Sequence, residues 1–112
     1  MGHFTIFKGS DDQFYFNLKA NNGETILGSQ GYTTKQACKD GISSVRTNSP
    51  VDSRYERKIA TSGQYYFVLT ATNGQTIGKS QMYGTASARE TGIASVKLNA
   101  PGAEVLDSTP VY

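Results

Sequence analysis

Residues 13–30 read QFYFNLKANNGETILGSQ, and residues 64–81 read QYYFVLTATNGQTIGKSQ. The second stretch repeats the first at an offset of fifty-one positions, and about half of the residues from 13 to 50 recur at this offset without a gap. Agreement over such a length indicates an internal duplication. The sequence therefore predicts one domain of 112 residues, made of repeat 1 (about 3–52), repeat 2 (about 53–107) and a loose tail (108–112).

Each repeat shows two periodicities in turn. Alternating apolar residues in 13–20 and 64–71 predict half-buried strands, and Asn22-Gly23 and Asn73-Gly74 predict hairpin turns into strands at 24–29 and 75–80. Further along, apolar residues recur every three or four positions, which predicts helices that begin near Thr34 and Thr85 and stop before a proline. Strand-forming residues also occupy 3–8, 53–58 and 104–107.

These elements make two β-β-β-α-β units, so the expected fold class is α+β. Nothing in the sequence resembles a flexible linker between the units, and a shared sheet buries the most apolar surface. We therefore expect one antiparallel sheet with both helices packed on one face, an approximate two-fold axis relating the repeats, and the strand after each helix pairing with the other unit. Gly41 and Gly92, at equivalent places within the helices, predict a close approach of each helix to the sheet.

The composition excludes several classes of protein. Eleven Lys and Arg against nine Asp and Glu give a net charge of +2, smaller than the clustered excess typical of nucleic-acid binders. The single cysteine, Cys38, cannot form an intrachain disulfide, which favours a reducing compartment. No apolar run approaches the ~20 residues of a membrane span, and the first residues do not resemble a signal peptide. We expect a cytoplasmic, monomeric protein without membrane contact.

Four short stretches carry a resemblance to a known family. They are 54–58 (RYERK), 73–78 (NGQTIG), 92–96 (GIASV) and 99–101 (NAP). With them, nearly the whole chain is similar to the YegP-like family of small bacterial proteins, which are built from one or two copies of this unit. The resemblance implies one antiparallel sheet with two helices on one face and exchanged terminal strands. It implies no catalytic residues, because no activity is assigned to the family.

Candidate catalytic groups are few. A nucleophile needs a base within hydrogen-bond reach, and the chain offers only Cys38, on the predicted core face of a helix, and His3, near the amino terminus. Asp11 and Asp12 lie in a predicted turn, where aspartate is common. No phosphate-binding glycine loop and no zinc-ligand spacing occurs. We therefore expect a protein that is not an enzyme and that uses no cofactor or metal.

Two sets of polar residues recur between the third strand and the helix of each unit. They are Ser29, Gln30 and Tyr32 in repeat 1, and Ser80, Gln81 and Tyr83 in repeat 2. One interpretation is a pair of equivalent small-ligand sites near the helix starts, where backbone N–H groups favour anions. The simpler interpretation is that these residues cap the helix and anchor the loop.

The sheet face away from the helices offers a second candidate site. Strand alternation places Tyr15, Asn17, Lys19 and Tyr66 on this face, and Tyr55 and Arg57 are expected beside them. Tyrosine and arginine are enriched in protein interfaces, so an unidentified protein partner is the preferred hypothesis. The same residue types can stack and hold single-stranded nucleic acid, which is the alternative. A third hypothesis is a small-ligand protein that uses the paired polar residues.

Overall fold

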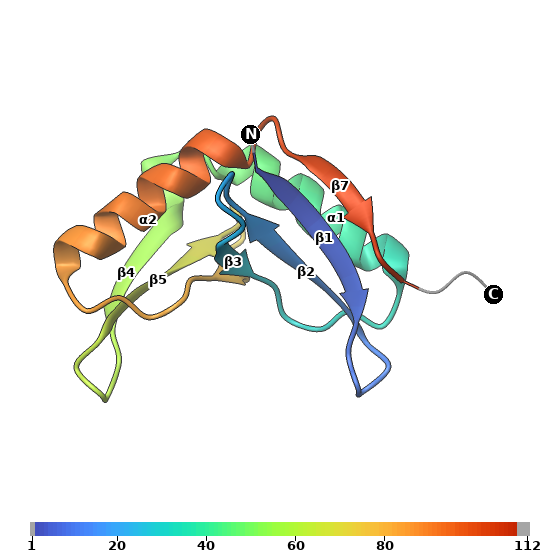
Figure 1. Cartoon of the computed structure of the whole chain (residues 1–112), viewed down its shortest axis with the longest axis horizontal. Coiled ribbons are helices and arrows are strands. Elements are labelled where there is room, and N and C mark those ends of the chain that lie inside the picture. Colours follow the sequence, from blue (N-terminus) through green and yellow to red (C-terminus); the bar gives the residue numbers. More distant parts are fainter. Residues whose placement is uncertain (1, 110–112) are drawn as a thin grey trace.

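The computed structural model describes residues 2–109 and confirms the α+β class (Figure 1). The elements are β1 (His3–Lys8), β2 (Phe14–Lys19), β3 (Thr25–Gly28), α1 (Lys35–Asn48), a 3₁₀ turn (Asp52–Arg54), β4 (Tyr55–Ile59), β5 (Tyr65–Thr70), β6 (Thr76–Lys79), α2 (Ala86–Asn99) and β7 (Glu104–Asp107). The strands form one seven-stranded sheet in the order β4-β5-β6-β3-β2-β1-β7. Both helices lie on the same face of this sheet.

Local chemistry sets the ends of these elements. The Thr34 hydroxyl accepts a hydrogen bond from the Ala37 N–H, and Thr85 does the same for Ala88, each over 3.0 Å. These threonines satisfy backbone donors that the first helical turn leaves free. The predicted hairpins form as well, and Gly23 turns with a φ of 85°, a conformation that glycine adopts without strain.

The two halves of the sheet meet at a narrow joint. There β3 pairs with β6 through one position, Gly28 opposite Lys79. Because the sheet bends at this joint, the molecule has the shape of an arch, with the helices above and the β1–β2 and β4–β5 hairpins pointing down on either side (Figure 1). One detail differs from the expected antiparallel sheet: β7 runs parallel to β1, so the sheet is mixed.

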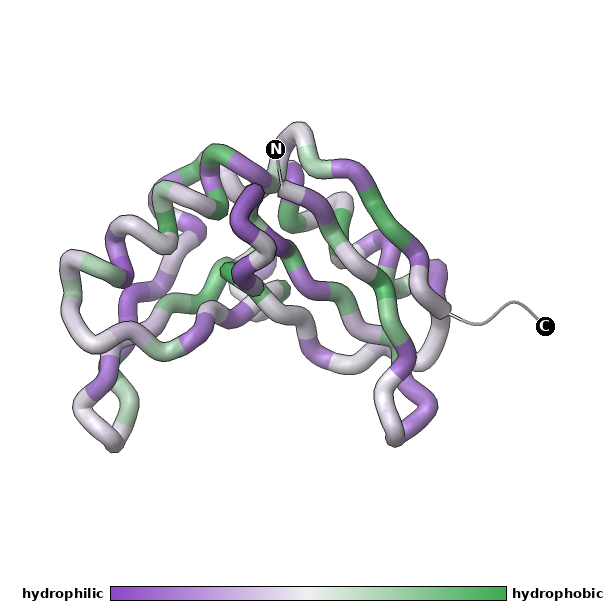
Figure 2. The backbone as a smooth tube through the Cα atoms, in the orientation of Figure 1, coloured by the Kyte–Doolittle hydropathy of each residue, from purple (hydrophilic) through white to green (hydrophobic). Residues whose placement is uncertain are grey.

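A single core fills the space between the helices and the sheet. Phe4, Phe16 and Phe67 are completely buried there, as are Val45 and Val96 of the two helices. Figure 2 shows the corresponding alternation of hydrophobic and hydrophilic residues along the strands. Each helix contacts strands of both repeats, α1 packing on β2, β5 and β6, and α2 on β3 and β5. The repeats therefore share one core, and neither half is a separate lobe.

The ends of the described chain are tied to each other. The Asn99 side chain accepts a hydrogen bond of 2.8 Å from the Gly2 N–H, across ninety-seven residues of sequence. Ser108 donates from its N–H and its hydroxyl to the Ile6 carbonyl, and Thr109 donates to the Asp107 carboxylate. The expectation of a loose tail from residue 108 is therefore wrong for residues 108 and 109, and residues 110–112 lie outside the described part.

The mid-helix glycines make room for tyrosine rings. A Cβ atom at Gly41 would lie 2.4 Å from the Tyr32 hydroxyl oxygen, and one at Gly92 would lie 2.2 Å from that of Tyr83. The two tyrosine rings stack on Phe16 and Phe67 respectively. The helices thus approach the sheet closely, as expected, but the contact at the glycines is with a side chain that rises from the sheet.

Candidate binding surface

We call the sheet surface away from the helices the open face. A row of paired positions crosses it in the order Thr5, Asn17, Gly28, Lys79, Val68, Glu56. Tyr15 and Lys19 flank Asn17 along β2, and Tyr66 flanks Val68 along β5, because side chains two residues apart in a strand share a face. Tyr15, Asn17, Lys19 and Tyr66 therefore lie on the open face, as predicted.

Aromatic side chains lie on the open face in both repeats. In repeat 1, Phe7 and Tyr15 stack with their ring centroids 5.6 Å apart. The Tyr15 hydroxyl donates to the Asp11 carboxylate over 2.5 Å, which raises the pKa of the tyrosine and lowers that of the aspartate. In repeat 2, the Lys79 ammonium lies 5.0 Å from the centre of the Tyr66 ring, within range of a cation–π interaction.

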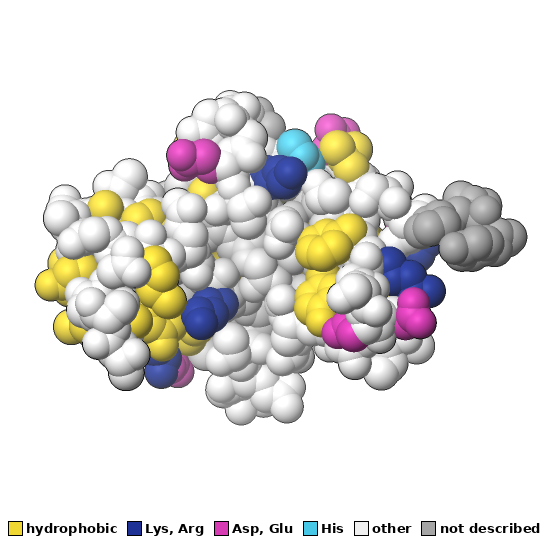
Figure 3. All heavy atoms as spheres, turned by 60° about the horizontal axis from the view of Figure 1, so that its bottom comes forward, with side chains coloured by type: hydrophobic (Ala, Val, Ile, Leu, Met, Phe, Trp, Pro, Cys, Tyr) yellow, Lys and Arg dark blue, Asp and Glu magenta, His cyan; other side chains and the backbone are white. Residues whose placement is uncertain are grey.

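The centre of the open face is hollowed. A depression of about 220 Å³ there is lined by Gly28, Ser29, Gln30, Thr76, Gly78 and Lys79. Figure 3 looks toward this side of the molecule and shows hydrophobic side chains gathered on either side of a central strip that carries few of them. Within residues 2–109, neither Lys79 nor Lys19 forms an ion pair, so the two cations are available to an incoming anionic group.

Two residues expected on the open face lie on the helix side instead, so their predicted placement was wrong. Tyr55 is buried, and its hydroxyl donates to the Ser49 carbonyl over 2.7 Å. Arg57 pairs with Glu90 of α2 over 2.9 Å and with Asp52 over 3.2 Å. Their strand positions lie opposite Leu69 and Phe67, whose side chains are in the core. The repeat offset held the correct signal, because it equates Tyr55 with the buried Phe4.

The recurring serines hold the backbone. The Ser29 hydroxyl accepts from the Phe16 N–H and donates to the Gln30 carbonyl, and Ser80 makes the matching pair of bonds in repeat 2. These bonds continue the hydrogen bonding between neighbouring strands past the ends of β3 and β6. The loop-anchoring interpretation therefore accounts for both serines, and neither hydroxyl needs a ligand to satisfy it.

The tyrosines of the two polar sets lie in unequal surroundings. Tyr83 and Gln81 border a groove of about 390 Å³ that the β2–β3 hairpin of the other repeat closes with Asn22 and Glu24. Burial raises the pKa of Tyr83, and the Glu24 carboxylate adds to the rise. At the equivalent position repeat 2 has Gln75 where repeat 1 has Glu24. The two sites are therefore not chemically equivalent, and a carboxylate on this groove disfavours an anionic ligand.

No catalytic pair forms between the sole cysteine and the sole histidine. Cys38 is completely buried on α1, where Asp107, at the far end of the β1–β7 ladder, influences its pKa. His3 lies at the opposite end of that ladder, paired with Glu104. Asp11 accepts hydrogen bonds from Gln13 and Tyr15, as a turn residue does. Among residues 2–109, no group of three or more His, Cys, Asp or Glu side chains is placed to hold a metal ion.

The Cys38 thiol is expected to be inert in the folded protein. Burial, followed by the nearby Asp107 carboxylate, raises its pKa from 9.0 to about 11. Folding thus favours the protonated thiol, and this contribution to stability is present below pH 9 and is lost as the pH rises toward 11. At pH 8 we expect a disulfide reagent to modify Cys38 only as fast as the protein unfolds. An engineered Ser62→Cys thiol in the exposed β4–β5 turn should react at once, and equal rates at the two positions would contradict the burial of Cys38.

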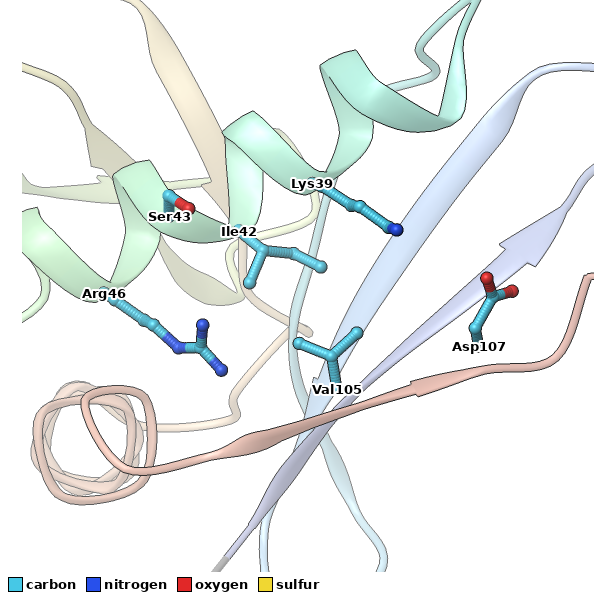
Figure 4. A pocket seen from close by; sticks show the side chains of 6 residues that line it. All are labelled: Lys39, Ile42, Ser43, Arg46, Val105 and Asp107. Carbon is cyan, nitrogen blue, oxygen red and sulfur yellow. The ribbon is translucent and has the colours of Figure 1, made fainter.

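A shallow groove separates α1 from β7 (Figure 4). It measures about 340 Å³ and is lined by Lys39, Ile42, Ser43, Arg46, Val105 and Asp107. Across it, Lys35 pairs with Asp107 over 2.9 Å, and Arg46 donates to the Ala103 carbonyl while its guanidinium lies over the Phe4 ring. The groove is the seam along which β7 docks on the first repeat, and Arg46 and Asp107 are engaged in that docking.

Sequence reasoning missed two contributors to the open face. Phe7 was not assigned to a face because β1 alternates weakly, although its neighbours Phe4 and Ile6 are both in the core. Lys79 was overlooked because its counterpart in repeat 1 is Gly28, so the position does not recur. A comparison of the repeats for differences, in addition to identities, places Lys79 among the candidates.

The fold and this surface define a class of small α+β protein in which two repeats share one sheet roofed by two helices. A family model described as "Domain of unknown function (DUF1508)" matches residues 10–56 and again residues 60–107. The chain therefore belongs to this family, and the double match confirms the duplication seen in the sequence. None of the helices within residues 2–109 has the length and apolar character needed to cross a membrane.

Known relatives are similar over nearly the whole chain. The UPF0339 protein YegP of Escherichia coli K12 is 57% identical over 108 residues, which cover 96% of this chain and 98% of that protein. A UPF0339 protein of Bordetella pertussis is 54% identical over 109 residues, covering 97% and 98%. The solution NMR structure of E. coli yegP, titled a protein of unknown function, matches with a TM-score of 0.93 at 56% identity, covering 99% of this chain and 96% of that chain. A UPF0339 protein of Shewanella oneidensis matches with a TM-score of 0.91 at 47% identity, covering 96% and 92%. The resemblance to YegP-like proteins is thus confirmed.

Proposed function

We propose that this protein is a non-enzymatic binding module whose open face holds a segment of another protein. The observation that carries the proposal is the arrangement at the centre of that face, where aromatic rings from both repeats flank a depression beside Lys79, which forms no ion pair within residues 2–109. Tyrosine offers a large contact area at a small cost in conformational entropy, which suits it to protein interfaces. A concave, largely preformed surface adds to this because little reorganisation accompanies binding.

Substitution of the open face tests this proposal. In the variant Tyr15→Ala, Tyr66→Ala, Lys79→Ala, three side chains of the proposed interface are truncated while the core residues remain. We expect proteins captured by the wild type from a native lysate to be lost or reduced at least tenfold, since tyrosine is enriched among the few interface residues whose truncation costs about 2 kcal/mol or more. Quantitative mass spectrometry of the captured proteins is the measurement.

A matched variant on the opposite surface serves as the control. Thr47, Ser87 and Leu98 are exposed on the helices, and their replacement by alanine changes an equal number of side chains. The control variant should capture the same proteins as the wild type. A captured set that is unchanged by the open-face substitutions, or is lost equally in both variants, would reject the proposal.

Single-stranded nucleic acid is the second candidate, favoured by one observation. The Lys79 ammonium beside the Tyr66 ring combines a stacking platform with a cation, the pairing that such proteins use for base and phosphate. Binding of this kind weakens steeply with salt because phosphate contacts release counterions. A fluorescence titration with a labelled oligonucleotide at low salt, and again with Tyr66→Ala, distinguishes the candidates. Absence of binding by the wild type at low salt would remove this one.

A further inference from the structure

The two halves of the sheet differ at their outer edges. In repeat 1, β1 is covered on its outer side by β7, and the Ile6 carbonyl accepts a hydrogen bond from the Ser108 N–H. In repeat 2, the equivalent strand is β4, and Arg57 stands where Ile6 does. The sheet order ends at β4, so within residues 2–109 no strand covers it. The pseudo-symmetry of the fold thus provides a place for one more strand, which the described part of the chain does not fill.

The backbone groups that face outward at β4 can be identified. The Ala60 N–H donates to Gln64, so residue 60 faces the β5 side of the hairpin. Direction alternates along a strand, and therefore Arg57 and Ile59 direct their N–H and C=O groups away from β5. Tyr55 would do the same, but its N–H already donates to the Asp52 carbonyl. Outward groups of this kind form a template for pairing with another strand.

The charges of β4 favour a second copy of β4 as that strand. When two copies pair antiparallel with Arg57 at the centre, Glu56 of each copy lies opposite Lys58 of the other, giving two cross-strand pairs of opposite charge. A two-fold arrangement centred on Lys58 places two lysines opposite each other, and one centred on Glu56 places two glutamates. Opposite charges directly across an antiparallel pair stabilise it, and like charges destabilise it. Of these three registers, only the one centred on Arg57 pairs Glu56 with Lys58, and the like pair at its centre is Arg57 with its own copy.

The side chains on the helix side of β4 tolerate this register. Arg57 lies opposite its own copy there, but the guanidinium already pairs with two carboxylates, Glu90 at 2.9 Å and Asp52 at 3.2 Å, so its charge is compensated within each chain. Ile59 is 65% exposed in the single chain and comes opposite Tyr55 of the second copy, which removes apolar surface from water. At the other end of the sheet, β7 begins and ends with the acidic residues Glu104 and Asp107. Lys35 offsets the charge of Asp107 within the chain, but two antiparallel copies of β7 would place Glu104 opposite Asp107 and would form no pair of opposite charges.

We propose that β4 is a self-association edge, through which two copies join their sheets into one continuous sheet with Glu56 of each chain paired to Lys58 of the other. The contact involves one strand of five residues from each copy, Tyr55–Ile59, so we expect a weak dimer that forms as concentration rises. This proposal differs from the monomer that the sequence led us to expect. It also leaves the open face uncovered in each copy, so its test is independent of the proposed binding function.

Two charge reversals test the register. In Glu56→Lys, both cross-chain pairs become Lys–Lys, and in Lys58→Glu both become Glu–Glu. Sedimentation velocity over a range of concentrations up to about 1 mM should show the wild type associating, and each variant alone associating at least tenfold more weakly. An equimolar mixture of the two variants should recover association, because every pair between unlike chains is then Lys–Glu.

Thermal unfolding of each variant serves as the control for correct folding. The midpoints should stay close to that of the wild type, because Glu56 and Lys58 form an exposed pair of 3.6 Å within the chain and such pairs contribute little to stability. A second variant, Ile59→Pro, removes an outward N–H donor at an edge position where proline is tolerated, and it should also weaken association. A wild type that stays monomeric at 1 mM, or variants that associate as well as the wild type, would overturn the proposal. So would an open series of larger species, which indicates head-to-tail pairing of β4 with the outer edge of β7.

Discussion

Replacing Gly78 by leucine is expected to lower the free energy of unfolding by several kcal/mol. Gly78 and Leu27 occupy equivalent positions in the repeats, on either side of the joint between β3 and β6. Leu27 is completely buried, and a Cβ atom at Gly78 would already lie 2.6 Å from two of its side-chain carbons. One leucine fills the space at the joint. A second one overpacks it, and overpacking costs about 1–3 kcal/mol or more.

The reciprocal change separates this explanation from a general intolerance of substitution. Leu27→Gly should cost about 2–5 kcal/mol by itself because it leaves a cavity in the core. The exchange Leu27→Gly, Gly78→Leu moves the leucine to the other side of the joint, and we expect it to be more stable than the sum of the single losses predicts. Urea unfolding of the four proteins gives the coupling energy, which should be about 0.5–3 kcal/mol in favour of the exchange. Additive losses would show that the two positions do not compete for one space.

Gly92→Ala is expected to destabilise the protein by about 1–3 kcal/mol, although alanine is the better helix former. In an exposed helix this substitution gains about 1 kcal/mol. Here the added methyl group would lie 2.2 Å from the hydroxyl oxygen of Tyr83, whose ring is fixed by stacking on Phe67. The steric cost exceeds the gain in propensity because moving the Tyr83 ring away from α2 disturbs its stacking on Phe67.

Removal of the tyrosine hydroxyl should recover part of that loss. The Tyr83 ring carbon beside the oxygen also lies 2.6 Å from the built Cβ position, so Gly92→Ala combined with Tyr83→Phe relieves the contact incompletely. Thermal unfolding of the single and double variants measures this. Gly41 and Tyr32 provide an internal repetition of the experiment, and Ser87→Ala at an exposed site of α2 should be close to neutral or stabilising. A Gly92→Ala protein as stable as the wild type would refute the role assigned to the glycine.

The sequence predicts the elements of this fold well because local chemistry determines them. The hairpins follow from Asn22-Gly23 and Asn73-Gly74, and the helices begin after the capping residues Thr34 and Thr85. Apolar alternation in β2 and β5 also places Tyr15 and Tyr66 on the correct face of the sheet. In each case the determining residues lie within a few positions of the feature that they determine.

Features that depend on distant neighbours were not predictable in this way. β4 is too polar for alternation to fix its faces, so Tyr55 and Arg57 were assigned to the open face although they contact Ser49 and Glu90. The side chain of Asn99, at the end of α2, accepts a hydrogen bond from the Gly2 N–H near the other end of the chain, a contact that no local pattern predicts. The parallel pairing of β7 depends likewise on where the second helix delivers the chain, which periodicity does not encode.

The joint between β3 and β6, where Leu27 of one repeat lies beside Gly78 of the other, bears on how a duplicated protein can evolve. In a dimer of two identical subunits with the same joint, the two equivalent positions must carry the same side chain. A leucine at position 27 would then meet a second leucine. Fusion of the copies into one polypeptide removes this restriction, and unlike residues become permissible on the two sides. A single gene that encodes both repeats therefore permits different residues on the two sides of the joint, and the repeats can diverge more at some positions than at others.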